Sequence, residues 1–100
     1  MVHSTINRER ENAGSVSVVY HKIDITELDN TGTENYDPDA EVGISGADEY
    51  GVDVVGLEDP SLAVQWDHPN GALNLRNLSD GAQVADNTDV GEVILRVFGK

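Results

Sequence analysis

Cysteine is absent from the 100 residues of this sequence, and only Lys22 and Lys100 are lysines. The chain can therefore form neither a disulfide framework nor a thiolate site. No apolar run approaches the roughly 20 residues that a membrane-spanning helix requires. Residues 1–15 also lack the apolar segment of a secretory signal. We expect a protein that is made in the cytoplasm and has no membrane partner.

The motifs of common enzymes are missing too. His3, His21 and His68 are far apart in the sequence, with no short spacing of the kind that zinc sites use. There is no G-x-S-x-G nucleophile elbow, no Walker loop and no G-x-G-x-x-G. The sequence thus predicts no enzyme activity, no catalytic residue, no cofactor and no metal ligand.

Acidic residues cluster in "DPDAE", with Asp37, Asp39 and Glu41, and in "DNTD", with Asp86 and Asp89. Such segments offer oxygen atoms that suit calcium, but neither has the spacing of an EF-hand loop. In so acidic a chain, carboxylates gather through composition alone. A solvated surface is the favoured interpretation of these clusters, and a bound cation is the alternative.

The strongest signal in the composition is charge, with 19 Asp or Glu against 6 Lys or Arg and a formal net charge of -13. This much like charge repels itself at ordinary ionic strength, whereas near 1 M salt the Debye length falls to about 3 Å. We infer adaptation to high salt. The alternative is an acidic protein that mimics nucleic acid or binds a basic partner. Binding to nucleic acid or to an anionic membrane is disfavoured, because the chain would repel phosphate.

The apolar residues favour strands, since 13 Val and 5 Ile stand against 7 Leu and branched side chains suit a pleated surface. Turn signals separate apolar segments about every ten residues, and no helical period follows residue 15. The sequence therefore predicts an all-β fold, an antiparallel β-sandwich or small barrel of about six strands. We expect a β-sandwich domain at 16–100, preceded by a flexible N-terminal arm at 1–15. One short strand is predicted at residues 40–44.

Two strands show irregular alternation. Val18 and Val19 are adjacent in the first strand, so either both of its faces are covered or a bulge switches the inward set there. Gly56 marks a second expected bulge. In "GEVILRVFGK" apolar residues lie on both faces, which indicates a central strand or one whose second face meets another subunit.

The stretch "DHPNG" at Asp67 to Gly71 predicts a hairpin turn, because Asn-Gly readily adopts positive φ values. The loop is either the Asn-Gly pair alone or four residues long. In both registers Val64 and Trp66 share a face with the two leucines of the return strand, Leu73 and Leu75. Trp66 is interpreted as a core residue, with an aromatic platform for sugar or peptide as the alternative.

Several residues are candidates for contact with a neighbouring molecule. The second faces of the strands supply Val19, Val55, Ile94 and Phe98, and the long loop at 26–49 supplies Tyr36. The N-terminal arm adds Arg8 and Arg10. These two arginines belong either to a frayed terminus or to a locally positive segment that docks onto an acidic neighbour.

Residues 35–100 resemble small β-structured virion proteins of tailed viruses. The similar segments are "NYDPDAEVGI", "YGVDVV", "AVQWDHPNGALNL" and "VADNTDVGEVILRVFG". With the acidic composition, this resemblance implies a capsid-associated protein of a virus that infects halophilic archaea. It implies a decoration, cement or turret role, a homo-oligomer such as a trimer or pentamer, the major capsid protein as partner, and a place on the capsid surface.

Two alternatives stay open beside the capsid role. One is another structural protein of the virion, in the tail or at the head-tail junction. The other is a cellular β-sandwich module of a haloarchaeon that binds peptide or glycan through Trp66 and the acidic loop.

If the chain is adapted to high salt, its unfolding midpoint rises between 0.1 and about 3 M KCl, because salt screens the repulsion among its carboxylates. Thermal melts followed by circular dichroism measure this midpoint at each KCl concentration. A midpoint that does not depend on salt contradicts the adaptation.

Overall fold

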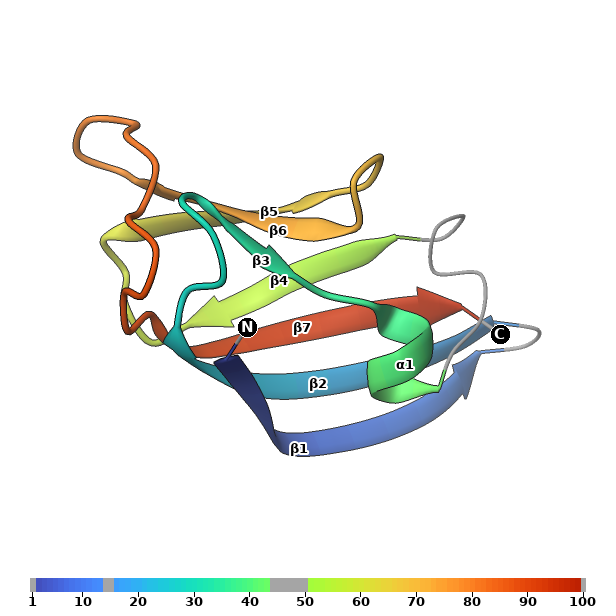
Figure 1. The fold of residues 1–100 in the computed structure, drawn as a ribbon. Coiled ribbons are helices and arrows are strands. Elements are labelled where there is room, and N and C mark those ends of the chain that lie inside the picture. The colour runs from blue at the N-terminus through green and yellow to red at the C-terminus, as the bar shows by residue number, and fades with distance from the viewer. Residues whose placement is uncertain (1, 14–15, 44–50, 100) are drawn as a thin grey trace.

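Two antiparallel sheets make up most of this computed structural model, which describes residues 2–13, 16–43 and 51–99 (Figure 1). The larger sheet has the order β1-β2-β7-β4 and contains β1 (Val2–Ala13), β2 (Val16–Glu27), β7 (Gly91–Gly99) and β4 (Val52–Leu57). The smaller sheet has the order β3-β6-β5 and contains β3 (Thr33–Asn35), β6 (Ala72–Asn77) and β5 (Leu62–Asp67). Buried residues of both sheets form one core. The all-β class is confirmed, with seven strands in the described residues.

The last strand, β7, is the central strand of the larger sheet and lies between β2 and β4. Val93, Leu95 and Val97 are completely buried on its inner face, whereas Ile94 and Phe98 on the outer face are half-buried. A strand with neighbours on both sides suits such a continuous run of branched apolar residues. The central position predicted from its two apolar faces is confirmed.

Strand β4 pairs with β7 through an interrupted register. The shift falls between Val54 and Gly56, which confirms the bulge expected at Gly56. The extra residue, Val55, has no partner on β7 and is 47% exposed. Val54 and Leu57 on either side of the bulge still pack against the core.

Strand β2 pairs continuously with β7, and one inward set runs along its whole length. Val19, His21 and Ile23 are buried, while Val18 lies on the other face. Of the two alternatives for this strand, the bulge that switches the inward set near Val18 and Val19 is therefore not formed. The alternation is hard to see in the sequence because His21, a polar residue, occupies an inward position within the apolar row.

Residues 2–13 form the edge strand β1, so the prediction of a flexible N-terminal arm is wrong. They pair with β2, and the boundary predicted after residue 15 would separate two paired strands. A register shift after Thr5 changes the residues that share the inner face, from His3 and Thr5 to Arg8 and Arg10. The strand escapes sequence analysis because these inward residues are polar and no single alternation covers the segment.

The β5–β6 hairpin turns through four residues, His68 to Gly71, because Asp67 pairs with Ala72. Gly71 adopts a φ of 63°, and its N–H donates to the Asp67 carbonyl at 2.9 Å. Within the Asn-Gly pair only the glycine has a positive φ. The four-residue alternative is therefore the observed loop, and the two-residue turn is not formed.

The shared face predicted for this hairpin is confirmed. Val64 lies opposite Leu75, and Trp66 lies opposite Leu73. Both leucines are completely buried, while Val64 and Trp66 are half-buried and pack against the core. Trp66 thus combines a core contact with an exposed part.

A short helix, α1 (Pro38–Val42), connects β3 to the segment before β4. Asp37 is its N-cap, Pro38 begins its first turn, and Gly43 ends it with a φ of 68°. The strand predicted at 40–44 is therefore wrong over residues 40–42, and residue 44 lies outside the described residues. Five residues are too few for a helical period to show in the sequence. Within the described ranges, no helix has the length and apolar character needed to cross a membrane.

Leu95→Ala should lower the free energy of unfolding by about 2–5 kcal/mol, because it leaves a cavity at the centre of the core. The matched control Val55→Ala removes an exposed side chain and should change it by less than about 0.5 kcal/mol. Urea denaturation in 2 M KCl measures both. Equal losses in the two variants would contradict the assignment of the inner face.

Candidate functional site

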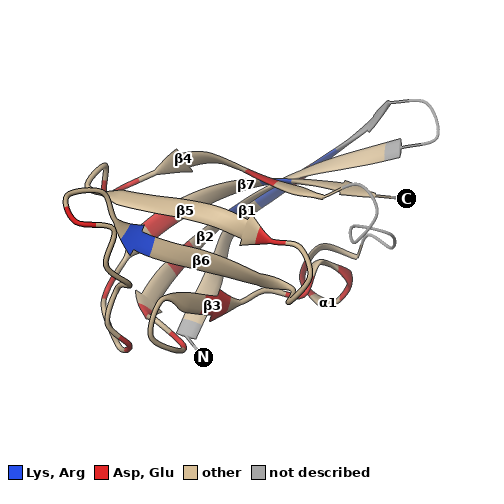
Figure 2. Cartoon of the chain, turned by 90° about the horizontal axis from the view of Figure 1, so that it is seen from above, with Lys and Arg blue, Asp and Glu red and all other residues tan. Residues whose placement is uncertain are grey.

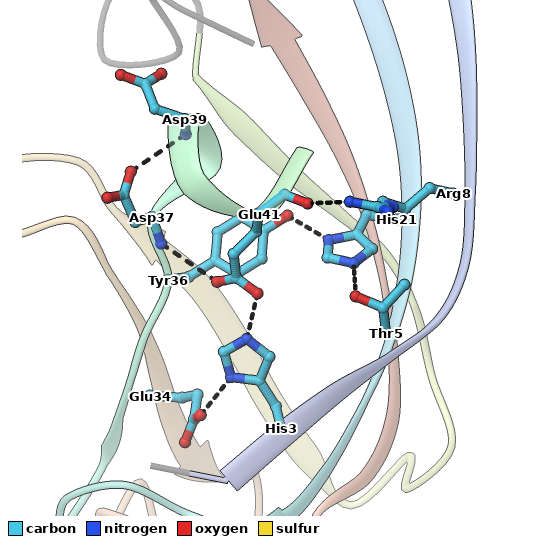
Figure 3. A network of polar contacts seen from close by, with 9 residues as sticks. All are labelled: His3, Thr5, Arg8, His21, Glu34, Tyr36, Asp37, Asp39 and Glu41. Carbon is cyan, nitrogen blue, oxygen red and sulfur yellow. Dashed lines mark hydrogen bonds and ion pairs between the residues drawn. The ribbon is translucent and has the colours of Figure 1, made fainter. Parts of the chain in front are cut away.

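Three charged side chains from β1, β3 and α1 meet at one edge of the core (Figure 3). The Nδ1 atom of His3 lies 2.6 Å from Glu34 Oε2, and its Nε2 atom contacts Glu41 Oε1. Glu34 is completely buried, and the His3 side chain is 3% exposed. The second oxygen of Glu34 accepts the backbone N–H of Asp29 at 2.8 Å. An imidazolium between two carboxylates gives each buried charge a partner, which burial of charge requires.

The two glutamates determine the protonation of His3. Burial by itself lowers the pKa of His3, but the hydrogen bonds to Glu34 and Glu41 and the charges of both carboxylates outweigh it and raise the pKa to about 9. His3 is therefore protonated at neutral pH and donates through both ring nitrogens.

A second histidine, His21, lies beside this charged cluster and contacts two hydroxyl groups. The Nδ1 atom of His21 is 2.6 Å from the Tyr36 hydroxyl, and its Nε2 atom is 2.8 Å from Thr5 Oγ1. Burial lowers the pKa of His21 to about 4 and raises the pKa of the Tyr36 hydroxyl above its usual value. The Tyr36 ring centroid is 6.1 Å from that of His3 and 5.7 Å from that of His21. One ring thus separates a charged histidine from a neutral one.

Helix α1 contacts β1 through a second side chain besides His3. Arg8 Nη1 donates to the Glu41 carbonyl oxygen at 2.6 Å. The second carboxylate oxygen of Glu41 accepts the Asp37 backbone N–H at 3.3 Å, and Asp37 Oδ1 in turn accepts the Asp39 N–H at 3.2 Å. The Arg8 bond holds α1 against the edge strand, and the other two bonds close the capping turn of α1 (Figure 3).

Two open hollows flank Tyr36 and share Tyr36, Asp37 and Gly71 in their linings. The first, of about 480 Å³, lies beside His3 and Glu41 and is also lined by Asn35 and Ala40. The second, of about 420 Å³, is completed by Pro38, Asp39, Trp66 and His68, and we name it the Trp66 hollow. The network of Figure 3 therefore forms the wall of a surface that a ligand can reach.

The network holds a proton more readily than a metal. Both ring nitrogens of His3 point at carboxylates, so neither offers a lone pair to an ion. In the part of the chain that the structure describes, no three His, Asp or Glu side chains are placed to hold a metal ion. The site therefore offers a buried positive charge, on His3, that links β1, β3 and α1.

The predicted contact residues fall into two groups. Val19 and Tyr36 are 3% and 2% exposed, so their assignment to a contact surface is wrong. Val19 belongs to the inward set of β2, and Tyr36 packs its ring between the histidines and the edge of Trp66. Val19 does not reach the outside of the molecule, and Tyr36 contributes to it only as part of the lining of the two hollows.

The remaining predicted residues lie at the surface. Arg8 and Arg10 are exposed on β1, where Arg10 Nη2 donates to Ser17 Oγ at 2.9 Å. Ile94 and Phe98 are half-buried on the outer face of β7, and Val55 is exposed at the β4 bulge. The structure therefore brings the two arginines together on one strand and the two β7 residues on another.

Sequence reasoning missed His3, His21 and Glu34 as members of one site. The histidines are 18 residues apart in the chain and come together because β1 and β2 pair. His3 lies opposite Ile25 and Thr5 opposite Ile23, on the same inner face as His21. A polar strand that pairs with an apolar one gives only a weak signal in the sequence. The register of the β1–β2 hairpin would have placed these residues on one face. Glu34 has no signal, because a buried glutamate looks like any other acidic residue of this chain.

Comparisons with protein-family models, with curated proteins and with solved structures give no match for this chain. Any functional interpretation therefore depends on the sequence, the geometry and the charge of the chain itself.

The unfolding free energy should be greatest near pH 6.5 and fall on both sides. Above pH 6.5 the unfolded chain releases the His3 proton that the folded chain keeps up to about pH 9, which removes about 3 kcal/mol. Below pH 6.5 unfolded His21 takes up a proton that folded His21 refuses down to about pH 4, so stability falls again. Urea melts from pH 4.5 to 9.5 at constant ionic strength measure both limbs.

His3→Gln should flatten the alkaline limb and leave the acid limb in place. His68→Gln, which removes a histidine outside the network, is the matched control and should preserve both limbs. An alkaline limb that persists in His3→Gln would show that another group causes it.

Proposed function

We propose that this protein is a structural component of a virion, a decoration, cement or turret domain on the major capsid protein shell of a tailed virus infecting halophilic archaea. The resemblance of residues 35–100 and the net charge of -13 support this role. The structural feature that supports it best is the outer face of the β1-β2-β7-β4 sheet. A tail or head-tail position is the alternative within the same virion.

This outer face exposes apolar side chains on the central strands. Tyr20 is 38% exposed, and Ile94 and Phe98 are half-buried. Phe98 lies opposite Val18 in the β2–β7 register, and the Arg96 guanidinium lies 5.4 Å from the centroid of the Phe98 ring. The face is thus partly apolar without a covering layer from the described chain, as suits burial against a copy or a shell.

Ion pairs interrupt the apolar residues. Lys22 Nζ lies 3.2 Å from Glu92 Oε1, and Arg96 Nη2 lies 2.6 Å from Asp53 Oδ2. All four side chains are more than a third exposed, so these pairs contribute little to stability and weaken further in concentrated salt. In concentrated salt, the apolar residues therefore contribute more to binding, relative to the charges that surround them, than they do in dilute buffer.

Charge is unevenly distributed over the molecule. The larger sheet carries four basic residues beside six acidic ones, and much of the remaining acidic charge lies in loops and at strand ends (Figure 2). The basic residues are Arg8, Arg10, Lys22 and Arg96, and the acidic ones are Glu9, Glu11, Asp24, Glu27, Asp53 and Glu92. The cations of the outer face, Lys22 and Arg96, are already paired with Glu92 and Asp53, so burial of apolar residues, rather than charge complementarity, supports contact between copies. Closed rotational symmetry then gives a trimer or pentamer.

In 2 M KCl the protein should be a closed oligomer, and Ile94→Thr should weaken its assembly about tenfold, a change of about 1.4 kcal/mol. The substitution keeps a branched side chain while removing apolar area from the outer face. Size-exclusion chromatography with light scattering measures the mass of each species.

Leu78→Thr is the matched control, because Leu78 is 63% exposed but lies in the turn after β6, away from this face. It should assemble like the unchanged chain. A strict monomer at high protein concentration would overturn the assembly, and a lack of cosedimentation with capsid shells would overturn the capsid position.

A further inference from the structure

The Trp66 hollow combines aromatic rings with negative charge. Its lining contains the rings of Tyr36, Trp66 and His68 and the carboxylates of Asp37 and Asp39. No lysine or arginine occurs in the lining that the structure describes. A hollow of about 420 Å³ accommodates a small ligand or one side chain of a larger one.

The rings of this hollow are held in place before any ligand arrives. Trp66 meets Tyr36 edge to face, with ring centroids 6.3 Å apart and an interplanar angle of 89°. The Tyr36 hydroxyl is bonded to His21, and the indole N–H of Trp66 donates to His68 Nδ1 at 3.2 Å. His68 Nδ1 is thus the acceptor that holds the indole ring in place. The Trp66 ring, held by Tyr36 and His68, therefore presents a fixed π-system to the hollow.

The carboxylates leave the hollow with an uncompensated negative charge. Asp37 and Asp39 are both exposed, Asp37 Oδ1 accepts the Asp39 backbone N–H within the α1 turn, and neither carboxylate forms an ion pair with a described residue. The nearby Glu41 differs, because its carboxylate contacts the imidazolium of His3. A cation entering the hollow thus meets two carboxylates that have no cationic partner within the described chain.

We propose that the Trp66 hollow binds an organic cation, the guanidinium or primary ammonium head group found on arginine and lysine side chains. The aromatic faces attract a cation through their quadrupoles, and the carboxylates add direct charge attraction. An uncharged sugar would use the rings but gain nothing from the two aspartates. The site does not depend on the virion role, since it can fail while the oligomer forms, or hold while the oligomer does not.

Trp66 is the only tryptophan, so its fluorescence reports on this hollow alone. The chain is titrated with ethylguanidinium, with capped Gly-Arg-Gly and with capped Gly-citrulline-Gly, at the lowest KCl concentration that keeps its circular dichroism spectrum native. Both cations should change the fluorescence saturably, and the neutral citrulline peptide should not. Tighter binding of Gly-Arg-Gly than of ethylguanidinium assigns the ligand to a protein side chain, and equal binding assigns it to a free cation.

The double variant Asp37→Asn with Asp39→Asn should weaken cation binding at least roughly threefold. Asparagine still caps a helix, so α1 should persist. The matched control, Asp86→Asn with Asp89→Asn, removes the same charge from exposed positions elsewhere and should leave the affinity unchanged. Equal binding of the citrulline peptide, or unchanged affinity in the Asp37 and Asp39 variant, would overturn the proposal.

Discussion

His3 holds a proton between Glu34 and Glu41, and this single positive charge allows two carboxylates to lie at the edge of an apolar core. Without it, the buried Glu34 would lose the cation that lies 2.6 Å from its carboxylate, which is costly in a medium of low polarity. The same contact fixes β1, β3 and α1 relative to one another. The positions of Tyr36 and of both hollows follow from that arrangement.

Two different mechanisms therefore limit repulsion in this acidic chain. Salt reaches the carboxylates at the surface and screens them, but it has little access to Glu34, which is completely buried. In the interior, protonated His3 reduces the repulsion between the carboxylates instead. Surface and interior thus respond to different variables, the surface to ionic strength and the interior to pH.

The sequence is informative where apolar residues alternate along a strand and fill the core. It is uninformative where polar residues occupy the inward positions. The class of the fold, the central place of β7, the bulge at Gly56 and the shared face of Trp66 and Leu73 follow from side-chain periodicity. The edge strand β1 does not, since its inward residues are His3, Thr5, Arg8 and Arg10 and a register shift breaks their spacing.

The site was the least predictable part for the same reason. Its members come from β1, β2, β3 and α1, and only strand pairing brings them together. The segment "DPDAE" was recognised as acidic, but its role as a capped helical turn depends on five residues, too few for periodicity. Tyr36 looked like a loop residue available to a partner, and burial between the two sheets changes that assignment.

The order of strands in the larger sheet also has a consequence for synthesis. β2 and β4 are neighbours of β7, and residues 91–99 are made after both. A nascent chain that has produced only the earlier strands lacks the central strand β7. The edges of β2 and β4 that bond to β7 then stay unpaired, and the apolar inner faces of these strands are not fully packed. The larger sheet must therefore close late and through long-range contacts, a slow kind of folding in which unfinished chains risk sticking to one another.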